Sequence, residues 1–338
     1  MSRLGRRHPG IAVVGVLILA AAAGSMTARV GPASPPSDAA TSNSYSPPRT
    51  PWGDPDLQGA FSNSDERGIP MSRPDTLKHF SLRHFPPAQL AHLNRQRALQ
   101  FHPEKNQWEE VHEPAQINNS RPWLVSDPPD GKIPRTLEAR LQEFSNLPTI
   151  VANGSPRPWE SLDLLSRCVT RGLPGSMMPD IFGNAYEIVQ APGVVVITYE
   201  AIHEARVVLL DGRPHVDSRI RTYLGDARGR FEGHSLVIET TNFTGRTPFY
   251  QSSDRLKLVE RFTPIAQNVL QWSVTLIDHR TWPTRWTFAM NLTRTPGRPL
   301  EFACHEGNYS MRNILAAAPN MVTTAKPEDL SPNLDSPR

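Results

Sequence analysis

The side chains best suited to proton transfer lie in three short stretches in the second half of the chain. The first is the segment 256–262, in which Glu260 shares a strand face with Leu258. A carboxylate on an apolar face must be paired, protonated or functional, because burial penalises its charge. Two interpretations follow: a buried pair with a nearby arginine, or an interior general acid or base. Asp278 ends the next expected strand in phase with Trp272, so we expect it to face the same interior.

The second stretch is the polar run 199–206, which contains Glu200, His203, Glu204 and Arg206. On one continuous strand the two glutamates and the arginine share a face and His203 takes the other, unless a bulge intervenes. An exposed hairpin with surface ion pairs is the alternative to a functional role for this run.

The third stretch is 304–309, in which His305 and Glu306 directly follow the last expected strand. Strand ends are where barrels place ligand-binding groups. His203, His215 and His305 have the residue type of a three-histidine zinc site, but no closely spaced pair such as H-x-H supports one. We therefore expect no cofactor, with a bound divalent metal as the alternative.

Aromatic residues lie close to these polar runs and indicate a pocket for an apolar, aromatic or sugar-like small molecule. No nucleophile elbow of the G-x-S-x-G type, P-loop or dinucleotide fingerprint is present. The candidate catalytic residues are His203, Glu260, Asp278, His305 and Glu306, and the candidate substrate-binding residues are Tyr199, Arg206, Asn242, Trp272, Trp286 and Tyr309.

The elements that must position these residues are short strands. Apolar residues alternate with period two between positions 186 and 306, and turn signals interrupt them. Without helix-sized intervals this pattern predicts an antiparallel meander, and closure into a lipocalin-like barrel removes its exposed edges. The expected strands are 186–190, 194–200, 205–210, 220–224, 234–242, 255–262, 269–278, 285–293 and 300–304.

The chain divides into five expected parts by composition: a signal peptide (1–28), a flexible linker (29–49), an irregular wrapping segment (50–181), the β-barrel core (182–315) and a disordered tail (316–338). The wrapping segment is rich in proline and contains two expected helices, 87–101 and 136–144.

The first 28 residues have the pattern of an export signal. Three arginines and no acid precede an apolar stretch from Ile11 to Ala23, which is shorter than the ~20 residues of a membrane span. An uncleaved anchor is the alternative, and the export route stays open. Removal of the signal lowers the formal net charge from +3 to zero, so we expect neither a stable membrane span nor a nucleic-acid partner.

The two cysteines, Cys168 and Cys304, favour a disulfide in an exported chain. The alternative is a free nucleophilic Cys304 beside His305. A bridge would tie the start of the barrel to its last expected strand.

Five motifs of this sequence resemble motifs of a single family of exported bacterial proteins, most of which are described as hypothetical. They are TPWGDPDLQG at 50–59, DGRPH at 211–215, GDARGRFEG at 225–233, ETTNF at 239–243 and ACHEGNY at 303–309. The resemblance covers nearly the whole chain behind the signal and implies a periplasmic or secreted bacterial protein, without a reaction. His279 stands where the family has a proline after Asp278.

Two functions are expected from these observations. The first is an exported, cofactor-independent enzyme (lyase, isomerase or hydrolase) that uses acid–base chemistry on a small substrate in the barrel. The second is a lipocalin-like carrier without catalysis. A surface interaction module is a third reading, and the oligomeric state is not predicted.

Overall fold

The computed structural model describes residues 45–100, 118–136, 151–152, 155–156, 162–180, 182–309 and 311–316. The expected signal peptide, most of the expected linker, the helix predicted after Thr136 and nearly all of the tail lie outside these ranges. Every described residue belongs to one compact unit, Ser44–Arg338. Within the described ranges no helix is long and apolar enough to cross a membrane.

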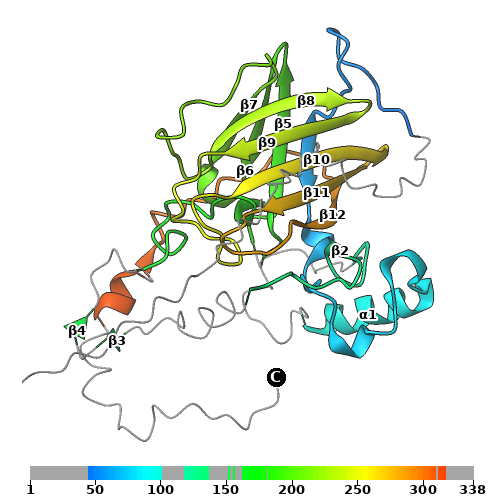
Figure 1. Cartoon of the computed structure of the whole chain (residues 1–338), viewed down its shortest axis with the longest axis horizontal. Helices are drawn as coiled ribbons and strands as arrows, with labels where there is room; N and C mark the ends of the chain where they lie inside the picture. Colours follow the sequence, from blue (N-terminus) through cyan, green and yellow to red (C-terminus); the bar gives the residue numbers. More distant parts are fainter. Residues whose placement is uncertain are drawn as a thin grey trace, which may run out of the picture. The chain divides into compact units, whose positions relative to one another are not determined.

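A closed β-barrel forms the centre of the described chain (Figure 1). Strand β1 pairs with both β5 and β12, so nine strands, β1 and β5 to β12, form a ring. Strand β2 adds to the part of β12 that β1 leaves unpaired. The strands are β1 (Gly59–Ser62), β2 (Val125–Asp127), β3 (Val151–Ala152), β4 (Ser155–Pro156), β5 (Ala185–Ala191), β6 (Val194–Tyr199), β7 (Ala205–Leu209), β8 (Asp226–Glu232), β9 (Ser235–Thr241), β10 (Lys257–Ala266), β11 (Val269–Ile277) and β12 (Trp286–Arg294).

The predicted fold class, a lipocalin-like barrel, is confirmed, but three parts of the expected strand order were wrong. Segments 220–224 and 300–304 form no strand. Strands β1 and β8 were not expected. The meander is antiparallel except between β7 and β8, which run parallel and share the single bridge Leu209–Arg228.

Strand β8 escaped prediction because its sequence is polar and contains a glycine. A Cβ at Gly229 would lie 2.7 Å from side-chain carbons of both Val208 and Leu210, so the missing side chain lets these residues pack against the strand. The interior there is filled from β7 and its following residue instead of from β8.

The barrel interior is packed with side chains in the alternating pattern that the sequence predicts. Inward residues of β10, β11 and β12 are buried at every second position. Aromatic rings gather toward one end, where Trp286 stands perpendicular to Trp282 and Tyr250. Phe249 stacks on Trp286 from the loop after β9.

The opposite end of the barrel is covered by residues 45–58, which we call the strap. Gln190 at the end of β5 anchors it, because the Gln190 side chain accepts a hydrogen bond from Leu57 N (2.6 Å) and donates one to the Pro55 carbonyl (3.1 Å). Leu57, itself a strap residue, is buried. The motif at 50–59 is therefore fixed to the end of β5.

The wrapping segment contains one of its two predicted helices, α1 (Pro87–Gln100), and short 3₁₀ turns at Ser64–Glu66, Asp75–Leu77, Leu82–His84 and Gly175–Met177. A buried arginine docks α1: Arg97 donates to Asn119 Oδ1 and to the Pro122 carbonyl, both at 2.6 Å. Glu66, 1 % exposed, accepts hydrogen bonds from Ser120 N and Asn291 N.

Replacing Glu66 with glutamine should weaken the pH dependence of stability. Burial raises the pKa of Glu66 above its ordinary value of 4.5, and the bond from Ser120 only partly opposes this. The folded protein then holds this proton to higher pH than the unfolded chain, so the free energy of unfolding falls as pH rises above 4.5. Burial also raises the pKa of Glu204. Glu66→Gln should therefore reduce the slope of the free energy of unfolding against pH without abolishing it.

Urea unfolding of the wild type and Glu66→Gln between pH 4.5 and neutral pH measures this slope. Glu306→Gln, on an exposed turn, is the matched control. An identical slope in the wild type and Glu66→Gln would contradict the assignment.

Candidate functional site

A charged pair occupies the interior of the barrel. Arg206 of β7 and Glu260 of β10 form a two-fold hydrogen-bonded ion pair, with Nη1 on Oε2 and Nη2 3.2 Å from Oε1. The side chains are 2 % and 0 % exposed. Trp272 Nε1 donates to Glu260 Oε1 at 3.1 Å. Of the two interpretations of Glu260, the structure has the buried ion pair with an arginine.

The protonation states around this pair are set by burial and by opposite charge. Burial alone would lower the pKa of Arg206, but the Glu260 carboxylate outweighs it and holds this pKa above its ordinary value. Burial also raises the pKa of the Tyr199 hydroxyl, although the neighbouring Arg206 opposes that rise. Arg206 is therefore a fixed cation and Tyr199 a neutral phenol at physiological pH.

The polar run 199–206 does not form one continuous strand. Strand β6 ends at Tyr199, a 3₁₀ turn covers Ala201–His203, and β7 begins at Ala205. The turn resets the alternation, so Arg206 points inward and His203 is exposed. The expectation that Glu204 and Arg206 sit on an exposed hairpin was wrong for Arg206, because its charge is matched by Glu260 across the barrel.

A cleft of about 390 Å³ opens beside this turn, and we call it the His203 cleft. Its floor comes from β5, β6 and the turn, and its far wall is the segment 298–301. Glu187 pairs with Arg298 across it at 3.3 Å, and Glu200 accepts a hydrogen bond from Ala185 N at 3.0 Å. The cleft thus combines an imidazole, carboxylates and a guanidinium.

The backbone at the floor of the cleft is strained. Ile202 and His203 have φ angles of 62° and 54°, in the left-handed region that non-glycine residues seldom adopt. For a β-branched residue such as Ile202 this conformation is an outlier. Strain of this kind costs roughly 1–3 kcal/mol per residue and gathers at functional sites.

The chain matches no protein-family model, no curated protein and no solved structure. The cleft must therefore be interpreted from its own residues.

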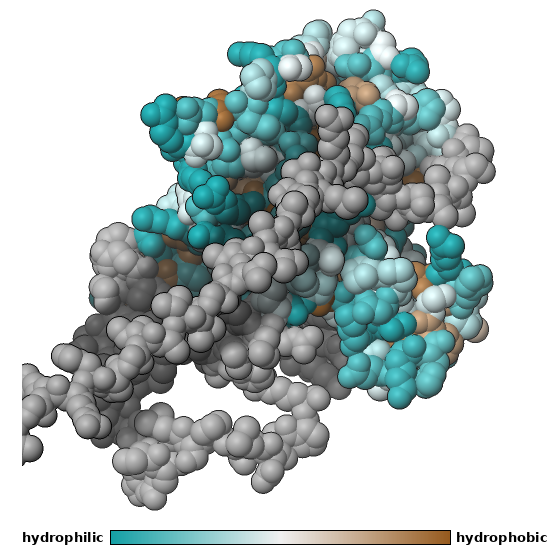
Figure 2. Space-filling model, in the orientation of Figure 1, coloured by the Kyte–Doolittle hydropathy of each residue, from teal (hydrophilic) through white to brown (hydrophobic). Residues whose placement is uncertain are grey.

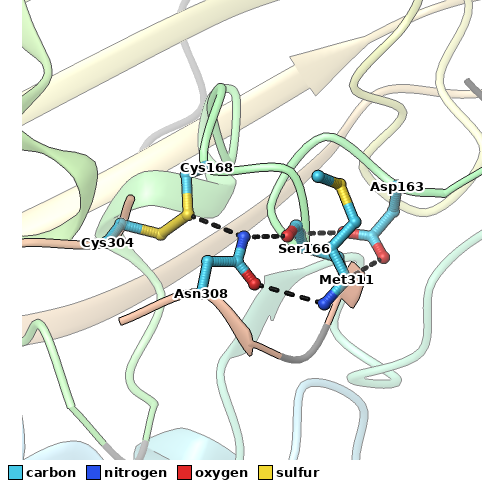
Figure 3. The surroundings of a disulfide bond; sticks show 6 residues. All are labelled: Asp163, Ser166, Cys168, Cys304, Asn308 and Met311. Atoms are coloured by element: carbon cyan, nitrogen blue, oxygen red, sulfur yellow. Dashed lines mark hydrogen bonds between the residues drawn. A yellow bond between two sulfur atoms is a disulfide. The ribbon is translucent and has the colours of Figure 1, made fainter. Parts of the chain in front are cut away.

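A disulfide follows the far wall of the cleft by three residues and ties this part of the chain to Cys168 (Figure 3). Cys168 and Cys304 are bonded, with their Cα atoms 5.7 Å apart, as predicted, although Cys304 lies in a turn and not at the end of a strand. Asn308 donates to the Ser166 carbonyl at 2.8 Å and to Cys168 Sγ at 3.2 Å. The free nucleophilic Cys304 is excluded by this bond.

The other candidate residues lie apart from the cleft and from the buried pair. Asp278 is buried and accepts hydrogen bonds from Ser253 N and Oγ, Arg280 N and Thr281 Oγ1, so it closes the corner after β11. Asn242 donates to the Val216 and Asp217 carbonyls. Trp286, another candidate, lies at the aromatic end of the interior. The last three candidates are exposed on or just after the turn that follows Cys304: His305, Glu306 and Tyr309.

The three histidines considered for zinc are engaged differently. His215 Nδ1 lies 2.7 Å from Asp226 Oδ2, whereas His203 and His305 lie on two different turns. Among the described residues, no group of three or more His, Cys, Asp or Glu side chains has the geometry of a metal site.

Sequence reasoning named Tyr199, Arg206, Glu260 and Trp272 as separate candidates and did not pair Arg206 with Glu260. It missed Arg298 and Glu301 as cleft residues. Nothing in their spacing indicates that the chain after β12 returns to β5 and β6. The one available signal was Cys304, because its bond to Cys168 carries the preceding residues back to the barrel.

Proposed function

We propose that this protein is an exported bacterial enzyme, of the family that its motifs resemble, which performs acid–base chemistry on a small organic molecule in the His203 cleft. Lyase, isomerase and hydrolase reactions all fit this description. The observation that supports it most directly is the exposed His203 imidazole, held on a strained turn at the floor of a cleft with carboxylate walls.

His203 is the proposed acid–base residue because an imidazole exchanges a proton near neutral pH. In an isomerisation the imidazole removes a proton from one substrate carbon and returns it to another, so no redox cofactor is needed. In an elimination the same proton goes to the leaving group. Arg298 is suited to hold a developing negative charge on the substrate, and the exposed Leu300 side chain offers an apolar contact.

The buried pair plays a supporting part in this proposal. Tyr199 contributes to the cleft wall, and its hydroxyl interacts with Arg206 inside the barrel. The pair and the tyrosine therefore connect the end of β6 to β10, which keeps the strained turn on a rigid base. Glu260 does not touch the substrate in this scheme.

Export of the protein is part of the proposal and is supported by the disulfide. Structural disulfides persist in oxidising compartments such as the periplasm or the exterior. The apolar segment 11–23 behind its arginines supplies the expected route out of the cytoplasm.

His203→Ala should lower turnover by about 10²–10⁴-fold, the usual contribution of general acid–base catalysis. The test incubates the mature, disulfide-bonded protein with a panel of small aromatic and sugar-derived compounds in D₂O and follows deuterium incorporation and product formation by NMR. His305→Ala is the matched control, since His305 is exposed on the turn beside the cleft wall. Equal turnover by wild type and His203→Ala would exclude His203 as the acid–base residue.

Small-molecule carriage without catalysis is the second candidate function. A separate cleft at the strap end of the barrel, lined mainly by apolar residues, favours it. Saturable binding with no turnover of any bound compound would support this candidate instead.

A further inference from the structure

A second cleft, of about 300 Å³, lies between the strap and the turn that joins β10 to β11, and we call it the strap cleft. Pro47, Pro48 and Leu57 line it from the strap, and Val269 and Leu270 line it from β11. Its volume is at the lower end of the range for small-molecule sites, which are mostly apolar with a few polar groups. It shares no lining residue with the His203 cleft.

The strap is held by hydrogen bonds that form this cleft in advance. Thr50 N donates to the Asp54 carbonyl at 2.8 Å, and Asp56 N donates to the Pro48 carbonyl at 2.8 Å. These bonds close the strap on itself, and the Gln190 anchor on Leu57 holds its C-terminal part against β5. A ligand would therefore enter a site whose walls are already ordered, which lowers the entropic cost of binding.

Gly59 creates a notch for the only cation in the cleft wall. A Cβ at Gly59 would overlap with Nη1 of Arg294, so the guanidinium can lie against β1 only because this residue has no side chain. Arg294 Nη1 donates to the Gln58 carbonyl at 2.8 Å, and the guanidinium carbon stands 4.8 Å from the centre of the Phe61 ring. The glycine of the motif at 50–59 thus positions an arginine 235 residues away in sequence.

The charges of the strap cleft favour an anion. Its charged residues are Asp56 and Arg294. Asp56 Oδ1 already accepts hydrogen bonds from Gln58 N at 3.0 Å and from Gln58 Nε2 at 3.3 Å. Arg294 is exposed, and the described part of the chain supplies it with no carboxylate partner. A guanidinium on an aromatic ring beside apolar walls matches a carboxylate attached to an apolar body.

We propose that the strap cleft binds a small organic monocarboxylate with an aromatic or branched aliphatic body. The Arg294 guanidinium binds its carboxylate, and the apolar residues of the strap and of β11 contact its body. This site is separate from the His203 cleft, and a test of one site does not decide the other.

The test uses benzoate and 3-phenylpropionate as probes, with benzamide as a neutral analogue of the same shape. Ligand-observed NMR titration of the mature protein should show saturable binding of the carboxylates and at least ten-fold weaker binding of benzamide. Arg294→Gln should weaken carboxylate binding at least ten-fold, and Arg294→Lys should weaken it less, since the charge is kept. Gly59→Ala should have an effect similar to Arg294→Gln, because the new methyl group displaces the guanidinium.

Arg230→Gln is the matched control, since it removes an exposed arginine from the outer face of β8, away from both clefts, and should leave probe binding unchanged. Thermal unfolding midpoints of all variants identify any variant that does not fold. If Gly59→Ala does not fold, Arg294→Lys still tests the role of the guanidinium. The proposal is overturned by the absence of saturable carboxylate binding, by equal binding of benzamide, or by an Arg294→Gln variant that binds as the wild type does.

Discussion

Arg206→Leu is expected to lower the free energy of unfolding by about 3–5 kcal/mol, because it leaves an uncompensated carboxylate inside the barrel. Glu260 is 0 % exposed, and in the variant only Trp272 Nε1 would still donate to it. Protonation of the isolated carboxylate removes its charge, so the loss of stability should shrink as pH falls. Urea unfolding of the two proteins at neutral and at acidic pH measures both effects.

The double variant Arg206→Leu/Glu260→Met should recover most of this stability. Two apolar side chains need no desolvation of charge, and such replacements of buried pairs are often neutral or stabilising. The four proteins of the cycle (wild type, each single variant and the double variant) therefore isolate the interaction between the two side chains.

Arg230→Leu on β8 provides the exposed counterpart of this experiment. Arg230 pairs with Glu232 on the outside of the barrel, where both side chains are largely exposed, and the variant should leave the unfolding midpoint almost unchanged. If Arg206→Leu lowers the free energy of unfolding no more than Arg230→Leu does, the interior pair contributes no more to stability than an exposed pair.

Loss of the disulfide should have the second large effect. Cys168 and Cys304 are separated by 136 residues, and closing a loop of that length is worth about 5 kcal/mol in the chain-entropy model. Cys304→Ser should therefore reduce stability by about 4–5 kcal/mol, and the wall of the His203 cleft should lose its attachment. Urea unfolding gives the first quantity, and hydrogen exchange of peptides that cover 298–309 gives the second.

Reduction of the wild type by a dithiol is the control for this variant. Two electrons and two protons convert the disulfide to two thiols while the dithiol is oxidised, so reduced wild type and Cys304→Ser should behave alike. The increase in exchange should be largest in the cleft wall and the neighbouring residues 163–172, because the barrel strands exchange faster only through the lower global stability. Unchanged exchange at 298–309 after reduction would contradict the role of the bond as an anchor of the wall.

The strands could be predicted because residues that face solvent differ in polarity from those that face the barrel interior. Figure 2 shows a mostly hydrophilic surface on which apolar residues occur in small separate groups. In β10 and β11 buried and partly exposed positions alternate, and most inward positions are apolar, so their alternation could be read directly. Strand β8 has no such contrast, because Gly229 replaces an inward side chain, and β1 has only four residues.

The candidate site was less predictable than the barrel. Glu260 was identified as a residue that needs a partner, because its parity placed it among apolar neighbours. The inward orientation of its partner Arg206 could not be predicted, since the 3₁₀ turn at Ala201–His203 changes which residues of the run face inward. The left-handed conformation of Ile202 and His203 could not be predicted from residue type, because β-branched residues such as Ile202 rarely adopt it and histidine adopts it in only a minority of cases.

The amino-acid sequence by itself determined the alternating strands of a β-barrel, a carboxylate on an apolar strand face and two cysteines suited to a bridge, because alternation and burial penalties depend on residue type and spacing. Only the tertiary structure decided which groups meet. The pairing of Arg206 with Glu260, the return of Arg298 to β5 and the contact of Arg294 with the Gly59 notch all join residues that are far apart in sequence. Such contacts depend on strand register, on closure of the ring by β1 and on the turn at His203, and these are settled by packing of the whole barrel.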